Sequence, residues 1–271
     1  MQVTRVRVHP VKSFAGLDVA SARVHPWGLD GDRRWAVVDE AGEPITAREE
    51  NRMLGLTAEP DGDALVLGDR DGAAELRVAA PVEAEPVPVG HSRQGTALPA
   101  GDEADAWVGE RLGRTARLVW QPDPTMRSVN PKHGGLPGDH VSLADVGPLL
   151  LASESSLAQL DRWTDDETPP LDILRFRPNV VIDGDPDAPF AEDAWPSVRI
   201  GDVRFRVSGT CDRCVMTTID PLTLRRGKEP IRTLARHRRW DGKTFFGVWL
   251  VPELDGSAAA VIRVGDEVVP G

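Results

Sequence analysis

The two cysteines of this 271-residue chain lie three positions apart in the stretch SGTCDRCVMTTIDP, residues 208–221. Cys211 and Cys214 can act as a redox pair, form half of a metal site, or provide one reactive thiolate beside an unreactive neighbour. A fourth possibility is that both thiols fill an apolar core, where free cysteine is most often found. The residues around the pair distinguish these alternatives.

The residues after Cys214 disfavour a thioredoxin-like redox pair. In such a site the Cys-x-x-Cys pair opens a helix, whereas here a run with β-branched residues stops within a few positions at Asp220-Pro221. A structural zinc site is disfavoured too. The six histidines contain no pair separated by three to five residues that would supply the missing ligands.

Arg213, between the two cysteines, bears on the remaining alternatives. It disfavours a dry core, because an unpaired guanidinium is costly to bury. A nearby guanidinium also lowers the pKa of a thiol from its usual value of about 8.5. The sequence therefore favours one reactive thiolate in an electropositive pocket, suited to metal ligation or to sulfur transfer.

The overall charge limits the classes of partner. The chain has 32 Lys and Arg against 43 Asp and Glu, a net charge of −11 and a pI near 5.1, which disfavours nonspecific binding to nucleic acid or membranes. The first residues, MQVTRVRVHPVKS, contain no continuous apolar segment, and no apolar run approaches the ~20 residues of a membrane span. We therefore expect a cytoplasmic protein with neither nucleic-acid nor membrane partners.

The elements that must position the cysteines are short. The 26 glycines and 23 prolines indicate many turns, and β-branched patterns predict strands in the first 80 residues, followed by a helix over Asp102–Leu112. After the turn-rich loop 121–140 we expect a strand at 149–151 and a helix capped by Ser153. Further strands are expected at 178–184 and 245–253, hairpins at 198–207 and 261–269, and a short helix within 234–240.

These elements predict an α+β fold that is mostly β, with a few helices. Length suggests about two domains at roughly 150 residues each. The turn-rich loop is the expected boundary. We therefore expect a strand-rich domain over residues 1–120 and a mixed β-barrel or sheet with a few helices over residues 121–271.

The segment CDRCVMTTIDP, residues 211–221, resembles the signature of MOSC-domain proteins, the family that includes the mitochondrial amidoxime reducing component. The shared pattern is an Arg-Cys pair, two hydrophobic residues, Thr-Thr, a β-branched residue and Asp-Pro. Further blocks resemble that family in the same order: HPVKSFAGLDV (9–19), DGDRRWAVVD (30–39), ITARE (45–49), RFRPNVVIDG (175–184) and RRGKEP (225–230). The resemblance implies a MOSC N-terminal β-barrel domain over 1–120 and a MOSC domain over 121–271.

The resemblance also implies a molybdenum cofactor (molybdopterin) bound between the two domains, with Cys214 as the protein ligand of molybdenum. A soft thiolate suits this metal, and Cys211 becomes a bystander. Asp145 matches the family's aspartate near molybdenum, although Ala144 and Val146 stand where the family often has Ser or Thr. The residues that match the family's cofactor-binding positions are Lys12, Ser13, Arg33, Arg177, Asn179 and Arg213.

From this resemblance we expect an enzyme, a molybdenum-dependent reductase of N-hydroxylated compounds such as amidoximes and hydroxylamines, in which Asp145 or water supplies protons. No G-x-G-x-x-G follows a strand, and two cysteines cannot provide the about four thiolates of an iron–sulfur cluster. The electrons are therefore expected from a separate flavin, haem or iron–sulfur protein. Two alternatives stay open: Cys214 carries a persulfide for sulfur transfer, or the chain is a non-catalytic carrier of the cofactor.

A basic run, RRGKEPIRTLARHRRW at residues 225–240, stands out on this acidic chain. It is suited to docking an acidic electron donor, to lining the rim of the cofactor site, or to forming a solvated helix face. The sequence alone does not separate these three uses.

Overall fold

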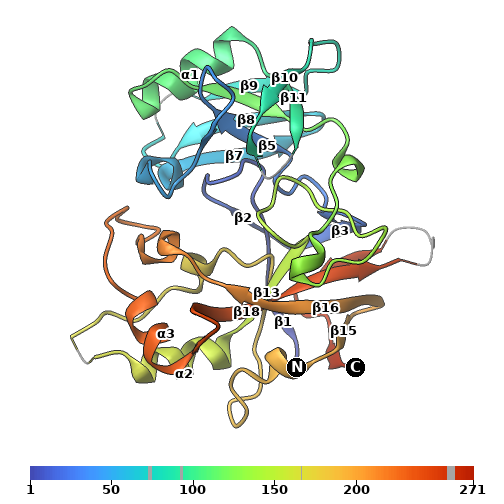
Figure 1. The fold of residues 1–271 in the computed structure, drawn as a ribbon, viewed down its shortest axis with the longest axis vertical. Coiled ribbons are helices and arrows are strands. Elements are labelled where there is room, and N and C mark those ends of the chain that lie inside the picture. The colour runs from blue at the N-terminus through green and yellow to red at the C-terminus, as the bar shows by residue number, and fades with distance from the viewer. Residues whose placement is uncertain (73–74, 92–93, 166, 255–259) are drawn as a thin grey trace.

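The computed structural model describes residues 1–72, 75–91, 94–165, 167–254 and 260–271. Strands dominate it and gather into two bodies, one built on a large sheet and the other on smaller sheets, with long loops between them (Figure 1). The prediction of a mostly β fold with a few helices is confirmed.

Most elements of the described residues are short. The strands are β1 Val3–Val8, β2 Leu17–Val19, β3 Ser21–His25, β4 Gly28–Leu29, β5 Trp35–Val38, β6 Pro44–Ile45, β7 Leu56–Asp61, β8 Ala64–Asp69, β9 Leu76–Ala79, β10 Val87–Val89, β11 Gly95–Pro99, β12 Arg117–Trp120, β13 Leu149–Ser153, β14 Val180–Ile182, β15 Ser197–Ile200, β16 Val203–Asp212, β17 Arg239–Trp240, β18 Lys243–Glu253, β19 Val261–Arg263 and β20 Val268–Pro270. The α-helices are α1 Asp102–Leu112, α2 Glu154–Trp163 and α3 Ile231–His237, and the single turns used below are η5 Ile173–Phe176 and η7 Val215–Thr218.

The large sheet has the order β2-β1-β14-β13-β18-β16-β15-β20, with β17 paired to β18. Neighbouring strands are antiparallel except β13 and β14, which run parallel. Inward-facing residues such as Val6, Leu151 and Phe205 form one buried apolar core. Strands β1 and β2 join this sheet although they come from the first 120 residues, and the boundary near residue 120 stays a prediction.

The other body contains the sheet β10-β11-β12-β5-β6 and the meander β7-β8-β9. Both pack around a second apolar core, into which α1 inserts Trp107 and Val108. This helix begins with an acidic first turn, which the helix dipole favours, and ends at Gly113 in the left-handed conformation. The predicted helix over residues 102–112 is confirmed.

The two predicted hairpins have different outcomes. The one at 198–207 forms as β15 and β16, whereas the one at 261–269 is wrong, because β19 pairs with β3 and β20 pairs with β15. A turn does form between them, where Asp266 N donates to Arg263 O at 3.2 Å. Each strand then pairs with a distant partner that buries Ile262 or Val268, and this burial outweighs local pairing.

Helices α2 and α3 pack side by side next to the large sheet (Figure 1). Ser153 caps α2 as predicted, since its Oγ accepts a hydrogen bond from Ser156 N at 3.1 Å. The helix expected within 234–240 is α3, which ends at His237; Arg239 and Trp240 pair with β18 instead. None of the helices that the structure describes has both the length and the apolar character of a membrane span. The cytoplasmic location stays a prediction.

A third apolar cluster links the large sheet to a segment that leads into the cavity described below. Phe246 of β18 is fully buried and stacks on Phe176 of η5, with ring centroids 3.9 Å apart. η5 is followed directly by Arg177. The stack therefore fixes the point at which Arg177 leaves the turn.

Phe246→Ala should lower the free energy of unfolding by about 3–5 kcal/mol, because it removes a fully buried ring and leaves a cavity beside Phe176. Phe246→Leu keeps more of the apolar volume and should cost clearly less. Urea denaturation followed by tryptophan fluorescence measures both losses. Equal losses would contradict this expectation, because they would show that the apolar volume retained by leucine contributes nothing to stability.

Candidate functional site

A cavity of about 190 Å³ opens where the two bodies meet. Seven of the eight residues predicted for the site line it: Lys12, Ser13, Arg33, Asp145, Arg177, Arg213 and Cys214. They come from the β1–β2 loop, the turn before β5, the loop before β13, the end of η5 and the end of β16. The fold thus brings together residues that are far apart in the sequence. The eighth, Asn179, is not a lining residue.

The two cysteines have different surroundings although both line the cavity. Cys211, near the end of β16, is 1% exposed, and its Sγ accepts a hydrogen bond from Arg213 Nη1 at 2.7 Å. Burial raises the pKa of the Cys211 thiol to about 12 despite this guanidinium, so the thiol is protonated at neutral pH. Cys214 is exposed and precedes the single turn η7, with no α-helix opening there. Cys214 is therefore the accessible thiol.

Asp145 contacts cationic side chains that come from the N-terminal part of the chain. Lys12 Nζ donates to Asp145 Oδ1 and, at 2.7 Å, to Leu143 O. Arg48 Nη2 donates to Asp145 Oδ2 at 2.9 Å, and the same guanidinium interacts with the thiol of Cys214. Burial acts to raise the pKa of Asp145, but Lys12 and Arg48 outweigh it and hold the pKa well below its usual range. Asp145 is thus an ionised carboxylate and a weak proton acceptor at neutral pH.

Two buried cations hold the loop that carries Asp145. Arg127 donates from Nη1 to Ala144 O at 2.6 Å and from Nη2 to Asp145 O at 3.2 Å. Lys12 is 7% exposed, and its pKa is lowered because desolvation exceeds the attraction of Asp145. Arg127 fixes the loop through main-chain carbonyls. These contacts do not depend on a hydroxyl side chain at position 144.

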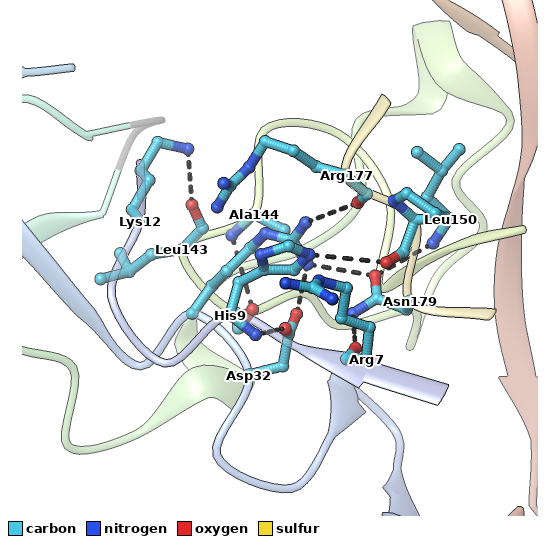
Figure 2. A network of polar contacts seen from close by, with 12 residues as sticks. Arg7, His9, Lys12, Asp32, Leu143, Ala144, Leu150, Arg177 and Asn179 are labelled. Atoms are coloured by element: carbon cyan, nitrogen blue, oxygen red, sulfur yellow. Dashed lines mark hydrogen bonds and ion pairs between the residues drawn. The ribbon is translucent and has the colours of Figure 1, made fainter. Parts of the chain in front are cut away.

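Asn179 belongs to a network of polar contacts with residues that line the cavity (Figure 2). Its Oδ1 accepts hydrogen bonds from Arg33 Nη1 at 3.1 Å and from Leu150 N at 3.2 Å, and its Nδ2 donates to Arg7 O at 3.1 Å. Arg33 also bonds to the buried carboxylate of Asp32. Because both ends of its amide are engaged, Asn179 positions Arg33 instead of facing the cavity.

Positive charge is concentrated around this network. Figure 2 shows Arg7, His9 and Arg177 gathered in one cluster. Burial, together with the adjacent Arg33, lowers the pKa of Arg177 to about 9. Burial, Arg177 and Arg33 also lower the pKa of His9 well below its usual value. The His9 imidazole is therefore neutral at pH 7, which limits the repulsion among the cations.

Three lining residues adopt the left-handed backbone conformation that favours glycine: Ser13, Arg33 and Arg177, with φ of 71°, 49° and 55°. A residue with a side chain costs about 1 kcal/mol in this region. Strain of this kind gathers at functional sites. No feature of the sequence signals these conformations, because Ser and Arg carry no special turn preference here.

The structure adds two residues that the sequence did not identify. Arg48 belongs to the ITARE block, but the block gave it no role, and Trp249 of β18 carried no signal; both line the cavity. Trp249 Nε1 is buried and has no hydrogen-bond partner among the described residues, and the same is true of Arg177 Nη2 and Arg213 Nε. Buried donors are normally satisfied. These three suit a ligand that is rich in acceptors.

Comparisons with known proteins agree over the length of the chain. Residues 1–115 match the MOSC N-terminal beta barrel domain, and residues 138–269 match the MOSC domain. The human mitochondrial amidoxime-reducing component 1 is 31% identical, over 98% of this chain and 82% of that protein. The mouse protein of the same name is 32% identical, over 98% of this chain and 81% of the relative.

The human molybdenum cofactor sulfurase is 30% identical over 99% of this chain, which spans 32% of the sulfurase. This relative is thus similar only along about a third of its own length. The two matched domains and the two relatives of similar length agree with the blocks quoted from the sequence. The chain belongs to the family of MOSC-domain proteins that carry a MOSC N-terminal β-barrel domain.

Proposed function

We propose that the cavity holds the molybdenum cofactor, that Cys214 is the protein ligand of molybdenum, and that the chain reduces N-hydroxylated compounds. The observation that carries this proposal is the accessible Cys214 thiol on the same cavity as a set of cationic side chains, Lys12, Arg33, Arg177 and Arg213. A soft thiolate suits molybdenum. Guanidinium and ammonium groups suit a ligand that carries a phosphate.

The unpartnered donors support the fit of this cofactor. Arg177 Nη2, Arg213 Nε and Trp249 Nε1 are buried without a partner in the described part of the chain. The pterin and phosphate of the cofactor are rich in acceptors and would satisfy such donors. In this proposal Asn179 contributes through Arg33, whose guanidinium it orients.

The cofactor, when bound, supplies a metal centre that exchanges two electrons. The net reaction consumes two electrons and two protons and converts the N–OH group of the substrate to N–H and water. Asp145 is ionised and engaged by Lys12 and Arg48, so we assign it the orientation of substrate or water beside Cys214, and we assign the proton supply to water. Lys12 and Arg48 hold this carboxylate in place.

The names of the relatives support the substrate class. Two of them are amidoxime-reducing components, and amidoximes carry an N–O bond. The electrons are assigned to a separate donor protein, because the two cysteines of this chain are too few for an iron–sulfur cluster of its own.

A sulfur-transfer role is the second candidate, and the exposure of Cys214 together with the likeness to the sulfurase favours it. Here Cys214 would take a sulfur atom from a separate persulfide donor and pass it on. Intact-protein mass spectrometry after incubation with such a donor would show an adduct of about 32 Da, lost on reduction. Cofactor binding with neither this adduct nor reduction of any N-hydroxylated compound would favour a carrier.

Cys214→Ala should abolish both molybdenum content and the reduction of benzamidoxime by reduced methyl viologen, because it removes the proposed metal ligand. Elemental analysis of the purified protein and an amine-release assay measure the two effects. Cys211→Ser is the matched control, since Cys211 is buried and protonated and a serine hydroxyl keeps an acceptor for the Arg213 guanidinium. It should retain both properties. Full molybdenum content and turnover in Cys214→Ala would refute the proposal.

Asp145→Asn should destabilise the protein without cofactor by about 1–3 kcal/mol at pH 7, because the buried ammonium of Lys12 loses its counter-charge. The pKa of Asp145 is lowered in the folded state, so the ion pair stabilises above the unfolded pKa of about 3.9. The stability gap between the two proteins should therefore narrow as the pH falls below about 4, toward the lower folded-state pKa. Urea denaturation from pH 7 to pH 3 measures the gap, and a constant gap would contradict the assignment.

A further inference from the structure

A short loop borders the mouth of the cavity. We call residues 221–228 the rim loop. It is tied to η7 and its flank, where Gly227 N donates to Thr218 O at 2.9 Å and Asp220 N donates to Arg225 O at 2.8 Å. It is tied to the opposite wall by Arg226, whose Nη2 donates to Arg48 O at 2.6 Å. Because η7 residues and Arg48 line the cavity, the rim loop lies beside its opening.

The rim loop carries exposed positive charge on an acidic protein. Arg225, Arg226 and Lys228 are exposed, and residues 221–228 contain no acid. Arg225 and Lys228 form no ion pair with any residue that the structure describes. Glu49, next to Arg48, is the nearby exposed acid that opposes this charge.

Most of the C-terminal part of the basic run is paired, although Arg239 is exposed and forms no ion pair with any residue that the structure describes. Arg232 pairs with Glu229 and Asp165. The side chain of Arg238 is 11% exposed, pairs with Asp193 and stacks on Phe190, 4.1 Å from the ring centroid. The structure thus leaves Arg225 and Lys228 exposed and without an ion pair among the described residues, whereas Arg232 and Arg238 are paired with acids.

Two exposed apolar residues belong to the segment between Cys214 and Arg225. Val215, the residue after Cys214, is 44% exposed, and Leu222 at the start of the rim loop is 72% exposed. Protein interfaces combine an apolar centre with a polar or charged rim. The segment that follows the accessible thiol thus combines exposed apolar side chains with exposed cations. A loop that served only to be solvated would not require large exposed apolar side chains.

We propose that the rim loop and Val215 form the docking surface for an acidic electron-transfer protein. This inference rests on the proposed function, because that reduction needs electrons from outside the chain. Docking here would place the redox group of the donor beside the opening of the cavity that Cys214 lines. Arg225 and Lys228 steer a negatively charged face toward it, and Val215 and Leu222 supply apolar contact.

The test compares two double charge reversals with equal change in net charge. Arg225→Glu with Lys228→Glu alters the rim loop and leaves Arg226, which holds Arg48. The matched control is Arg199→Glu with Arg204→Glu, two exposed residues paired across β15 and β16. Arg204 precedes the cavity-lining Asp212 by eight residues along β16, about 25 Å. That separation exceeds the Debye length of about 8 Å at physiological ionic strength.

The probe is an acidic plant-type [2Fe–2S] ferredoxin kept reduced by its reductase, with benzamidoxime as substrate and reduced methyl viologen as the small donor. The rim-loop variant should raise the apparent KM for ferredoxin about tenfold or more at low salt, while the control stays at the wild-type value. The difference should vanish near 0.5 M salt, where the Debye length is about 4 Å. The viologen-driven rate should not fall in either variant, and Glu49→Gln should lower the KM for ferredoxin.

Other outcomes overturn the inference. An unchanged KM for ferredoxin in the rim-loop variant at low salt would overturn the proposed docking surface. The proposal would also be overturned if the wild-type protein reduced benzamidoxime with electrons from viologen but not with electrons from ferredoxin. If viologen drives no reduction of benzamidoxime in the wild type, the proposed function fails. Calorimetric titration with ferredoxin then tests the docking surface independently of activity. About tenfold weaker binding by the rim-loop variant then supports it, and equal binding overturns it. If the viologen-driven rate falls in the double charge reversal, the neutral variant Arg225→Gln with Lys228→Gln replaces it. This variant should keep the full viologen-driven rate and raise the KM for ferredoxin, but by less than the charge reversal does.

Discussion

Buried positive charge at the junction of the two bodies is the constraint on which the site depends. Lys12, Arg33 and Arg177 face one small cavity, and their mutual repulsion has to be offset without filling it. Two carboxylates do this: Asp32 binds Arg33 from behind, and Asp145 binds Lys12. The guanidinium groups of Arg177 and Arg213, which also line the cavity, keep donors without a partner among the described residues. These donors are available to an anionic ligand.

Burial makes the two thiols of one short segment differ in accessibility. Cys211 lies within the sheet, where desolvation outweighs the neighbouring guanidinium of Arg213 and keeps the thiol protonated. Cys214 lies two residues past the end of β16, where it is exposed, lines the cavity and neighbours Arg48. Burial differs sharply across three positions because the strand ends between them. A thiol outside the sheet meets ligands and partners; a thiol inside it packs and accepts a hydrogen bond.

Most of the site residues named from the sequence lie on the cavity wall, seven of the eight. Asn179 was named as a cofactor-binding residue; its amide is hydrogen-bonded to Arg33, Leu150 and Arg7, and its role toward the cofactor stays a prediction. Arg48 and Trp249 were missed as site residues, because a single arginine or tryptophan in a strand-rich segment has no local pattern that sets it apart. The hairpin at 261–269 failed for a related reason: the turn is local, but the partners of β19 and β20 are not.

The sequence by itself determined the mostly β fold, helix α1, the cap of α2 and the family, and it pointed to the thiol segment that lines the cavity. These depend on local patterns, such as turn residues, capping residues and motif spacing, which a linear chain carries in full. The tertiary structure decided which thiol is accessible, which cations face the cavity and which of the basic residues are free. Those properties depend on burial and on charges brought together from distant segments, and neither is present until the chain has folded.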